Sequence, residues 1–199
     1  MRKLEVNVYR FNELKKQVQT EVIAKIREWK IEDAFKDLKD YLYEVLEYTY
    51  DLKVNKLIYS LSYSQGDGLS FSCNDLLESK YILNEIKQNL SRYEKAMFTK
   101  LRNNGIIYYL KSECNTGHYC YASKNQLELQ LDQYPYGNYT TEFKEKLYDK
   151  ILDIVGDVYM DICKDLETIG YGCYNVSDKE VIDYINDLEL EFFENGEVA

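Results

Sequence analysis

The spacing of apolar residues along the chain changes between the period of a strand and the period of a helix. Strict alternation predicts strands, and repeats of three to four residues predict helices. The order of these elements predicts an α+β fold, in which an antiparallel sheet of about four to five strands is packed against helices. The predicted strands cover 3–11, 56–64, 69–73, 106–111 and 119–131, and the predicted helices begin near Asn12, Glu32, Asn74, Thr141 and Ser177.

Three local signals indicate where these elements begin and end. Gly66-Asp67-Gly68 separates two alternating runs and predicts a hairpin. Asn103-Asn104-Gly105 predicts the end of the helix that follows the hairpin. Ser177 followed three residues later by Glu180 is a capping box, which predicts the start of the last helix.

The composition is that of a soluble globular protein, because 45% of the residues are hydrophobic and 30% are charged. The longest uncharged apolar run, from Ile106 to Leu110, is too short to cross a membrane. The five cysteines form no Cys-x-x-Cys pair and are odd in number, which is typical of reduced thiols. We therefore expect the protein in a cytoplasm, with no membrane partner.

Negative charge is concentrated toward the end of the chain. The formal net charge is −10, and residues 142–199 hold 16 acidic and 5 basic residues, so the preceding part is nearly neutral. The chain has no evident linker or repeat. We therefore expect one α+β domain over 1–199, with an acidic helical part from about 141 to 199.

Within this acidic part, carboxylates recur every four residues. On a helix, this spacing puts successive carboxylates about 6 Å apart along the axis, which approximates the spacing of phosphates on a nucleic-acid strand. Such a run is usually a solvated face, but it also suits a surface that imitates nucleic acid or binds a basic protein. The residues are Glu145, Asp149, Asp153, Asp157, Asp161 and Asp165, and Asp187 and Glu191 extend the acidic character.

The same helix has a predicted apolar face that the acidic residues approach. Each step of four residues turns by about 40° around the axis, so Asp161 and Asp165 are expected to reach the flank of Ile154 and Val158. Either the helix is re-phased near Gly156, or these two aspartates are partly covered and need partners. The predicted apolar positions are Leu147, Ile151, Ile154, Val158, Ile162 and Leu166.

The glycine-flanked turn has a structural and a functional interpretation. Glycine adopts positive φ without strain and aspartate tolerates it, so a plain turn explains the sequence. As a binding site, the turn would present donors and an acceptor to a small anion, a sugar or a nucleotide. The candidate ligand-binding residues are Ser64, Gln65, Gly66, Asp67, Gly68 and His118, which is the one histidine of the chain.

His118 is also the one side chain with an ordinary pKa near neutrality. Cys114 and Cys120 lie close to it in the sequence, but the group lacks the second pair of ligands that a zinc site needs. No Walker or Rossmann spacing is present. We therefore expect no metal and no cofactor, and we assign no catalytic residue.

Residues 62–71, which read Ser-Tyr-Ser-Gln-Gly-Asp-Gly-Leu-Ser-Phe, resemble the signature of a widespread set of small phage and prophage proteins. Residues 9–14, His118-Tyr119 and a C-terminal pattern between Asp161 and Gly196 are similar to other parts of the same set. The resemblance implies a phage or mobile-element origin and no particular reaction. Such an origin favours host takeover or counter-defence, for which acidic anti-CRISPR proteins are one example.

Taken with the charge, the resemblance predicts a non-enzymatic inhibitor that binds a basic, nucleic-acid-handling host protein through an acidic surface. The alternative is a nucleotide or small-molecule binding protein, or an enzyme, organised around the glycine-flanked turn and His118. The net negative charge disfavours direct binding to nucleic acid.

Overall fold

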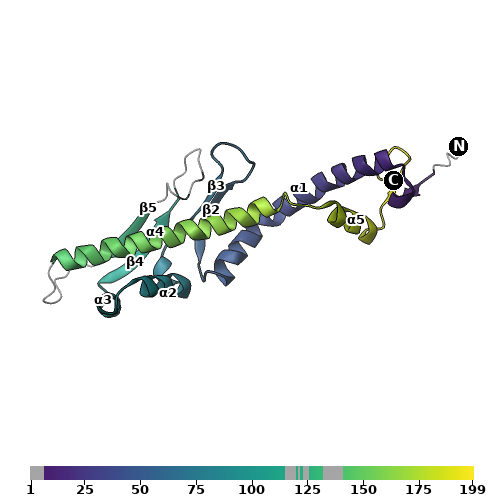
Figure 1. Ribbon diagram of the computed structural model, residues 1–199. Coiled ribbons are helices and arrows are strands. Elements are labelled where there is room, and N and C mark those ends of the chain that lie inside the picture. Colours follow the sequence, from purple (N-terminus) through teal and green to yellow (C-terminus); the bar gives the residue numbers. More distant parts are fainter. Residues whose placement is uncertain (1–6, 115–119, 121, 123–125, 132–140) are drawn as a thin grey trace. The chain divides into compact units, whose positions relative to one another are not determined.

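A computed structural model describes residues 7–114, 120, 122, 126–131 and 141–199. These residues form an α+β fold, as the sequence predicts (Figure 1). The helices are α1 (Lys16–Tyr48), α2 (Lys80–Asn89), α3 (Arg92–Asn103), α4 (Thr141–Gly172) and α5 (Asp178–Asp187), with 3-10 turns η1 (Phe11–Glu13) and η2 (Leu76–Glu78). The strands are β1 (Tyr9–Arg10), β2 (Val54–Ser60), β3 (Gly68–Cys73), β4 (Ile107–Glu113), β5 (Gln126–Leu131) and β6 (Glu191–Phe192).

The chain divides into two compact units. The terminal unit comprises residues 1–38 and 171–199, and the central unit comprises residues 39–170. The expectation of one domain over 1–199 stays a prediction. Each unit has its own buried apolar residues, and each is described separately below.

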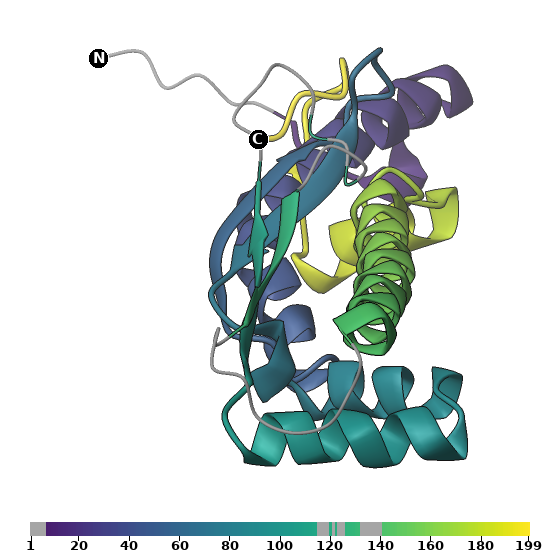
Figure 2. The same ribbon diagram turned by 90° about the vertical axis from the view of Figure 1, so that its left-hand side faces the viewer.

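The central unit contains a four-stranded antiparallel sheet in the order β2-β3-β4-β5. Helix α4 lies along one face of this sheet (Figure 2). The ring of Phe71 on β3 packs against the ring of Tyr159 on α4 at 4.4 Å between centroids. On β5, Leu127 lies against Gly156 of the same helix. The core of the unit therefore sits between the sheet and α4.

Strands β3 and β4 pair at a single register position, Cys73 opposite Ser112. Beyond this point, side chains replace the backbone partners that a continuous sheet would provide. The hydroxyl of Ser112 donates to the carbonyl of Phe71 and accepts from the amide of Cys73. From α4, the hydroxyl of Tyr159 accepts from the amide of Phe71 at 2.7 Å and donates to its carbonyl at 2.8 Å. Each of these buried backbone groups is thereby satisfied.

The predicted hairpin is confirmed, with a longer loop than the alternation suggests. Residue pairs run from Ser60 opposite Gly68 to Val54 opposite Cys73, with one irregularity near Lys56. Strand β2 ends at Ser60, and Tyr63 has a positive φ of 56° with 69% of its surface exposed. The strand predicted over 56–64 therefore ends earlier than expected, because the chain has already begun to turn at Tyr63.

Two of the predicted helix boundaries were wrong. The helices expected from Asn12 and Glu32 form a single helix, α1, because the residues between them include no glycine or proline to interrupt it. The long helix expected from Asn74 is instead η2, α2 and α3. Asp75, Ser79 and Ser91 cap these three segments through their own side chains, so each serine or aspartate begins a new segment.

Other predicted boundaries agree with the structure or lie outside the described residues. Helix α3 ends at Asn103, and Gly105 adopts φ of +69° after it, as the sequence signal predicts. Strand β4 spans Ile107–Glu113, slightly later than expected. Of the strand predicted over 119–131, β5 forms the last six residues, whereas Cys120 and Ala122, which are also described, do not belong to a strand. Residues 3–6 of the first predicted strand also lie outside them.

The terminal unit brings the two ends of the chain together. Strands β1 and β6 pair antiparallel, with Tyr9 opposite Phe192 and Arg10 opposite Glu191. The predicted capping box at Ser177 is confirmed and begins α5. The buried core of this unit consists of Leu14, Val22, Ile26, Val181, Ile185 and Phe192.

Candidate functional site

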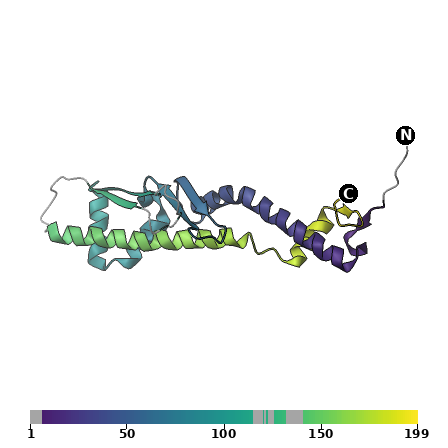
Figure 3. The same ribbon diagram turned by 90° about the horizontal axis from the view of Figure 1, so that it is seen from above.

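The outer face of α4 presents the predicted row of carboxylates to solvent. Helix α4 runs without interruption through Gly156 (Figure 3). All six acidic residues of the row are exposed, whereas the residues two positions after the first five of them are buried. A step of two residues is about 200° around a helix, which puts the two sets on nearly opposite sides. The exposed residues are Glu145, Asp149, Asp153, Asp157, Asp161 and Asp165.

The structure corrects the predicted apolar face of this helix. Val155 and Tyr159 are buried at 0% and 2% exposure, while Ile154 and Val158 are only half-buried. The covered side therefore turns along the helix together with the acidic row, as expected where a helix lies on a twisted sheet. For this reason Asp161 and Asp165 stay exposed, and no re-phasing at Gly156 is needed.

The last two aspartates of the row are not covered, so neither of the two alternatives holds, although both have partners. The hydroxyl of Tyr50 donates to the carboxylate of Asp165 at 2.8 Å, and Lys164 lies 3.5 Å from Asp161. Burial, followed by the hydrogen bond to Asp165, raises the pKa of the Tyr50 hydroxyl. Tyr50 therefore remains a neutral donor at physiological pH.

The other four carboxylates have no basic partner among the described residues. No lysine or arginine described in the structure lies within 4.0 Å of Glu145, Asp149, Asp153 or Asp157. Lys150, on the same helix, is directed away from the row and pairs with Glu94 of α3 at 2.8 Å. The first four carboxylates of the acidic row therefore form an anionic surface without ion pairs in the described part of the chain.

Glu94, in contrast, is a carboxylate whose hydrogen bonds stabilise the fold. Hydrogen bonds from Lys150 and from Ser91 lower the pKa of Glu94 from 4.5 to about 2. A lowered pKa means that the stabilising contribution is present above pH 4.5 and is lost as the pH falls toward 2. Glu94 also caps α3 by accepting from the amide of Ser91. Its charge is thus explained by the fold.

The two remaining predicted partner-binding residues, Asp187 and Glu191, belong to the terminal unit. Asp187 is the last residue of α5 and is exposed. Glu191 is exposed on β6, where its backbone register partner is Arg10. Neither residue belongs to the row on α4, and we treat the row by itself.

The glycine-flanked turn is organised around the carboxylate of Asp67. This carboxylate accepts hydrogen bonds from the hydroxyls of Ser60, Ser62 and Ser64 at 2.8 to 3.2 Å. It also accepts from the backbone amides of Ser62 at 2.6 Å and Ser64 at 3.0 Å. Although burial alone would raise the pKa of Asp67, these hydrogen bonds lower it below its ordinary value. Asp67 therefore holds the loop in shape as a carboxylate.

The other candidate residues of this turn have simpler surroundings. Gln65 is exposed, whereas Gly66 and Gly68 are buried. Gly66 adopts a φ of 104°, which glycine reaches without strain, and its carbonyl accepts from the amide of Cys120 at 3.4 Å. His118 lies outside the described residues. Because the serines of the loop already use the acceptor, the turn is explained as a self-contained structural element.

Sequence reasoning missed the inner side of α4 as a source of polar contacts. Tyr159 bonds both backbone groups of Phe71, and Glu167 accepts from the amide of Leu69 at 3.0 Å. Tyr159 was not among the predicted apolar positions of this helix, so the sequence analysis did not indicate this role. These residues close the open edge of β3 and are structural.

Neither a metal nor a membrane is indicated by the described residues. They contain no group of three or more histidine, cysteine, aspartate or glutamate side chains that could hold a metal ion. Among the described helices, none has the length and apolarity that crossing a membrane requires. No protein-family model, no curated protein and no solved structure matches this chain.

Proposed function

We propose that this chain is a non-enzymatic binding protein that engages a basic, nucleic-acid-handling protein through the outer face of α4. The observation that supports this proposal is the state of the first four carboxylates of the acidic row. Glu145, Asp149, Asp153 and Asp157 are exposed, follow one another at intervals of four residues, and have no basic partner among the described residues.

Physical chemistry explains why such a row suits a basic partner. Its carboxylates are about 6 Å apart along the axis, so a groove that binds successive phosphates finds anions at a similar spacing. Charge complementarity of this kind accelerates association and makes it sensitive to salt. Like charges at intervals of four residues also destabilise a helix slightly, so a functional reason for the row is needed.

We further propose that the bound protein is inhibited, and that the chain comes from a phage or mobile element. This part of the proposal rests on the resemblance of residues 62–71 to a phage and prophage signature. Blocking the nucleic-acid site of a host defence protein, as acidic anti-CRISPR proteins do, requires no catalytic residue. An acidic helix face is sufficient for it.

The proposal is tested by reversing the charge of the row. The variant D149K/D153K/D157K and the wild-type chain are used to capture proteins from a bacterial lysate at low salt. We expect the wild type to retain basic nucleic-acid-binding proteins that a short DNA duplex and added salt release. We expect the variant to lose them, because repulsion replaces attraction at the contact.

A matched control separates the row from total charge. The variant D37K/D40K/E44K changes the net charge by the same amount at exposed acids of α1. It should retain the same captured proteins, with affinities close to those of the wild type. If both variants lose them equally, net charge rather than the row is responsible. If neither does, the outer face of α4 is not a binding surface.

A further inference from the structure

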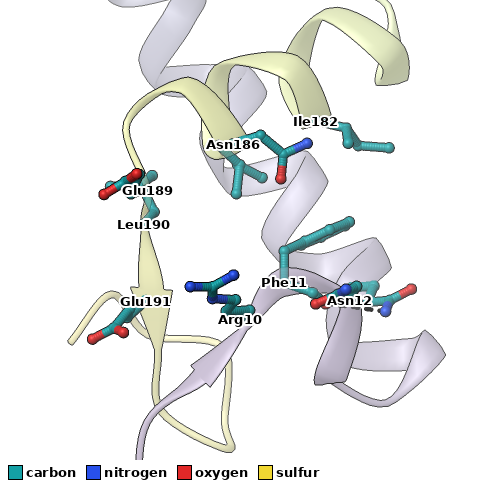
Figure 4. A pocket seen from close by; sticks show the side chains of 10 residues that line it. Arg10, Phe11, Asn12, Ile182, Asn186, Glu189, Leu190 and Glu191 are labelled. Carbon is teal, nitrogen blue, oxygen red and sulfur yellow. Dashed lines mark hydrogen bonds between the residues drawn. The ribbon is translucent and has the colours of Figure 1, made fainter.

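The terminal unit contains a pocket that the acidic row does not involve. It has a volume of about 760 Å³, which lies within the range of small-molecule sites. Its lining comes from the start of the chain and from the end of the chain (Figure 4). The lining residues that matter below are Arg10, Phe11, Gln19, Ile182, Glu189 and Glu191.

The pocket is lined mainly by polar groups, with two apolar side chains over a buried base. Phe11 and Ile182 are half-buried, so each leaves part of its apolar surface facing solvent. Ile185 is buried beneath them, at 1% exposure, as part of the core of the unit. The side-chain amide of Gln19 is fixed by donating to the carbonyls of Phe11 and Leu14, each at 3.0 Å. The half-buried side chains of Phe11 and Ile182 are therefore available to a ligand beside a fixed polar group.

Charged groups of both signs line this pocket. Arg10 and Glu191 are register partners in the β1–β6 pair, so their side chains share a face of the ribbon. Among the described residues, the guanidinium of Arg10 makes no ion pair or hydrogen bond, and Glu191 is likewise without a basic partner. In Figure 4, the Arg10 side chain lies between Glu191 and Phe11.

The second carboxylate of the pocket belongs to Glu189, at the turn between α5 and β6. Glu189 adopts a positive φ of 49°, and the amide of Leu190 donates to the carbonyl of Ile185 to close the helix. Glycine is the usual residue at this position of a helix end, since it avoids the steric cost of the left-handed conformation. Here the position instead adds a carboxylate to the pocket lining.

We propose that this pocket binds a short, unblocked peptide with apolar side chains, independently of the function proposed for α4. The planar guanidinium of Arg10 suits the carboxylate of the peptide, which it can bind through two hydrogen bonds. Glu189 and Glu191 accept from the peptide ammonium group. The apolar side chains contact Phe11 and Ile182. One cation against two carboxylates disfavours a phosphorylated or otherwise dianionic ligand.

The test uses the dipeptide Phe-Leu as the probe and the full chain in isothermal titration calorimetry. The unblocked dipeptide should bind, and its C-terminal amide and its N-acetyl derivative should each bind about tenfold or more weakly. Each blocked form removes one of the two charge-assisted contacts. Inorganic phosphate should not bind at this pocket.

Substitutions in the pocket test which residues bind each end of the peptide. R10Q should weaken the unblocked dipeptide about tenfold while leaving the C-terminal amide unaffected, because the amide no longer has the carboxylate that Arg10 binds. E189Q/E191Q should do the same for the ammonium end, with the N-acetyl form unaffected. K16Q, at an exposed lysine outside the pocket lining, should match the wild type.

Three results would overturn this proposal. The first is the absence of binding by the unblocked dipeptide up to about 10 mM, which is weaker than any specific site of this kind requires. The second is equal binding of free and amidated dipeptides. The third is equal weakening by R10Q and K16Q. Thermal unfolding of each variant shows whether it is folded, so a lost fold is not mistaken for a lost contact.

Discussion

The two sides of α4 differ in how far the fold makes use of their polar groups. On the inner side, Tyr159 and Glu167 accept hydrogen bonds from the backbone amides of Phe71 and Leu69 on β3. On the outer side, Asp149, Asp153 and Asp157 are exposed carboxylates without a described basic partner. Helix α4 thus contains polar groups that contribute to the stability of the fold on one side and polar groups that do not on the other.

This difference shows where a functional explanation is needed. A residue whose contacts satisfy buried groups is explained by the free energy of unfolding alone. Closely spaced like charges lower that free energy, so their presence is not explained by the fold. Substitutions on the inner side should therefore change stability, whereas substitutions on the outer side should change binding. The predictions below test this division.

The largest expected change in the free energy of unfolding comes from truncating the valine of α4 that faces the sheet. Val155 is fully buried and Val158 is half-buried. V155A should lower the free energy of unfolding by about 2 kcal/mol, since it removes buried methyl groups and leaves a cavity. V158A makes the same chemical change and should cost about 1 kcal/mol or less. Urea unfolding of both variants measures the difference. Equal losses would contradict the orientation of α4 described above.

The next effect concerns the hydroxyl group that closes the edge of β3. Y159F removes the partner of both backbone groups of Phe71, but the carbonyl of Phe71 still accepts from Ser112 at 3.2 Å. The amide of Phe71 then loses the hydrogen bond that it donates to Tyr159, so we expect a loss of about 1.5 kcal/mol in urea unfolding.

Tyr148, on the same helix, provides the control for this change. Its hydroxyl makes no hydrogen bond with the described residues. Y148F should therefore change the free energy of unfolding by less than about 0.5 kcal/mol. If Y159F were equally mild, the hydroxyl of Tyr159 would have no role in holding the edge of β3.

Local signals in the sequence were sufficient for several features. The glycines of residues 66–68 identify the hairpin, and Ser177 with Glu180 identifies the start of α5, because each depends only on neighbouring residues. These predictions needed no knowledge of distant contacts.

Other features depend on contacts between residues far apart in sequence. Ile154 and Val155 are both apolar and adjacent, so only the position of the sheet decides that Val155 is the buried one. Asn74 is a good capping residue, but Asp75 caps η2 and also accepts from the amide of Leu110 on β4. The pocket of the terminal unit joins residues near both ends of the chain, which no local pattern can reveal.

The smallest expected effect on stability is on the outer side of α4, where its sign is informative. D149N/D153N/D157N removes like charges spaced four residues apart, so the free energy of unfolding should stay constant or rise by a few tenths of a kcal/mol. The gain should shrink between about 0.02 M and 0.5 M salt, because salt screens exposed charges.

E94Q offers the opposite case, since Glu94 is paired with Lys150 and caps α3, and it should lower stability. If the triple variant instead loses more than about 1 kcal/mol in urea unfolding, the row is stabilising its own fold, and its charge no longer needs a partner to explain it.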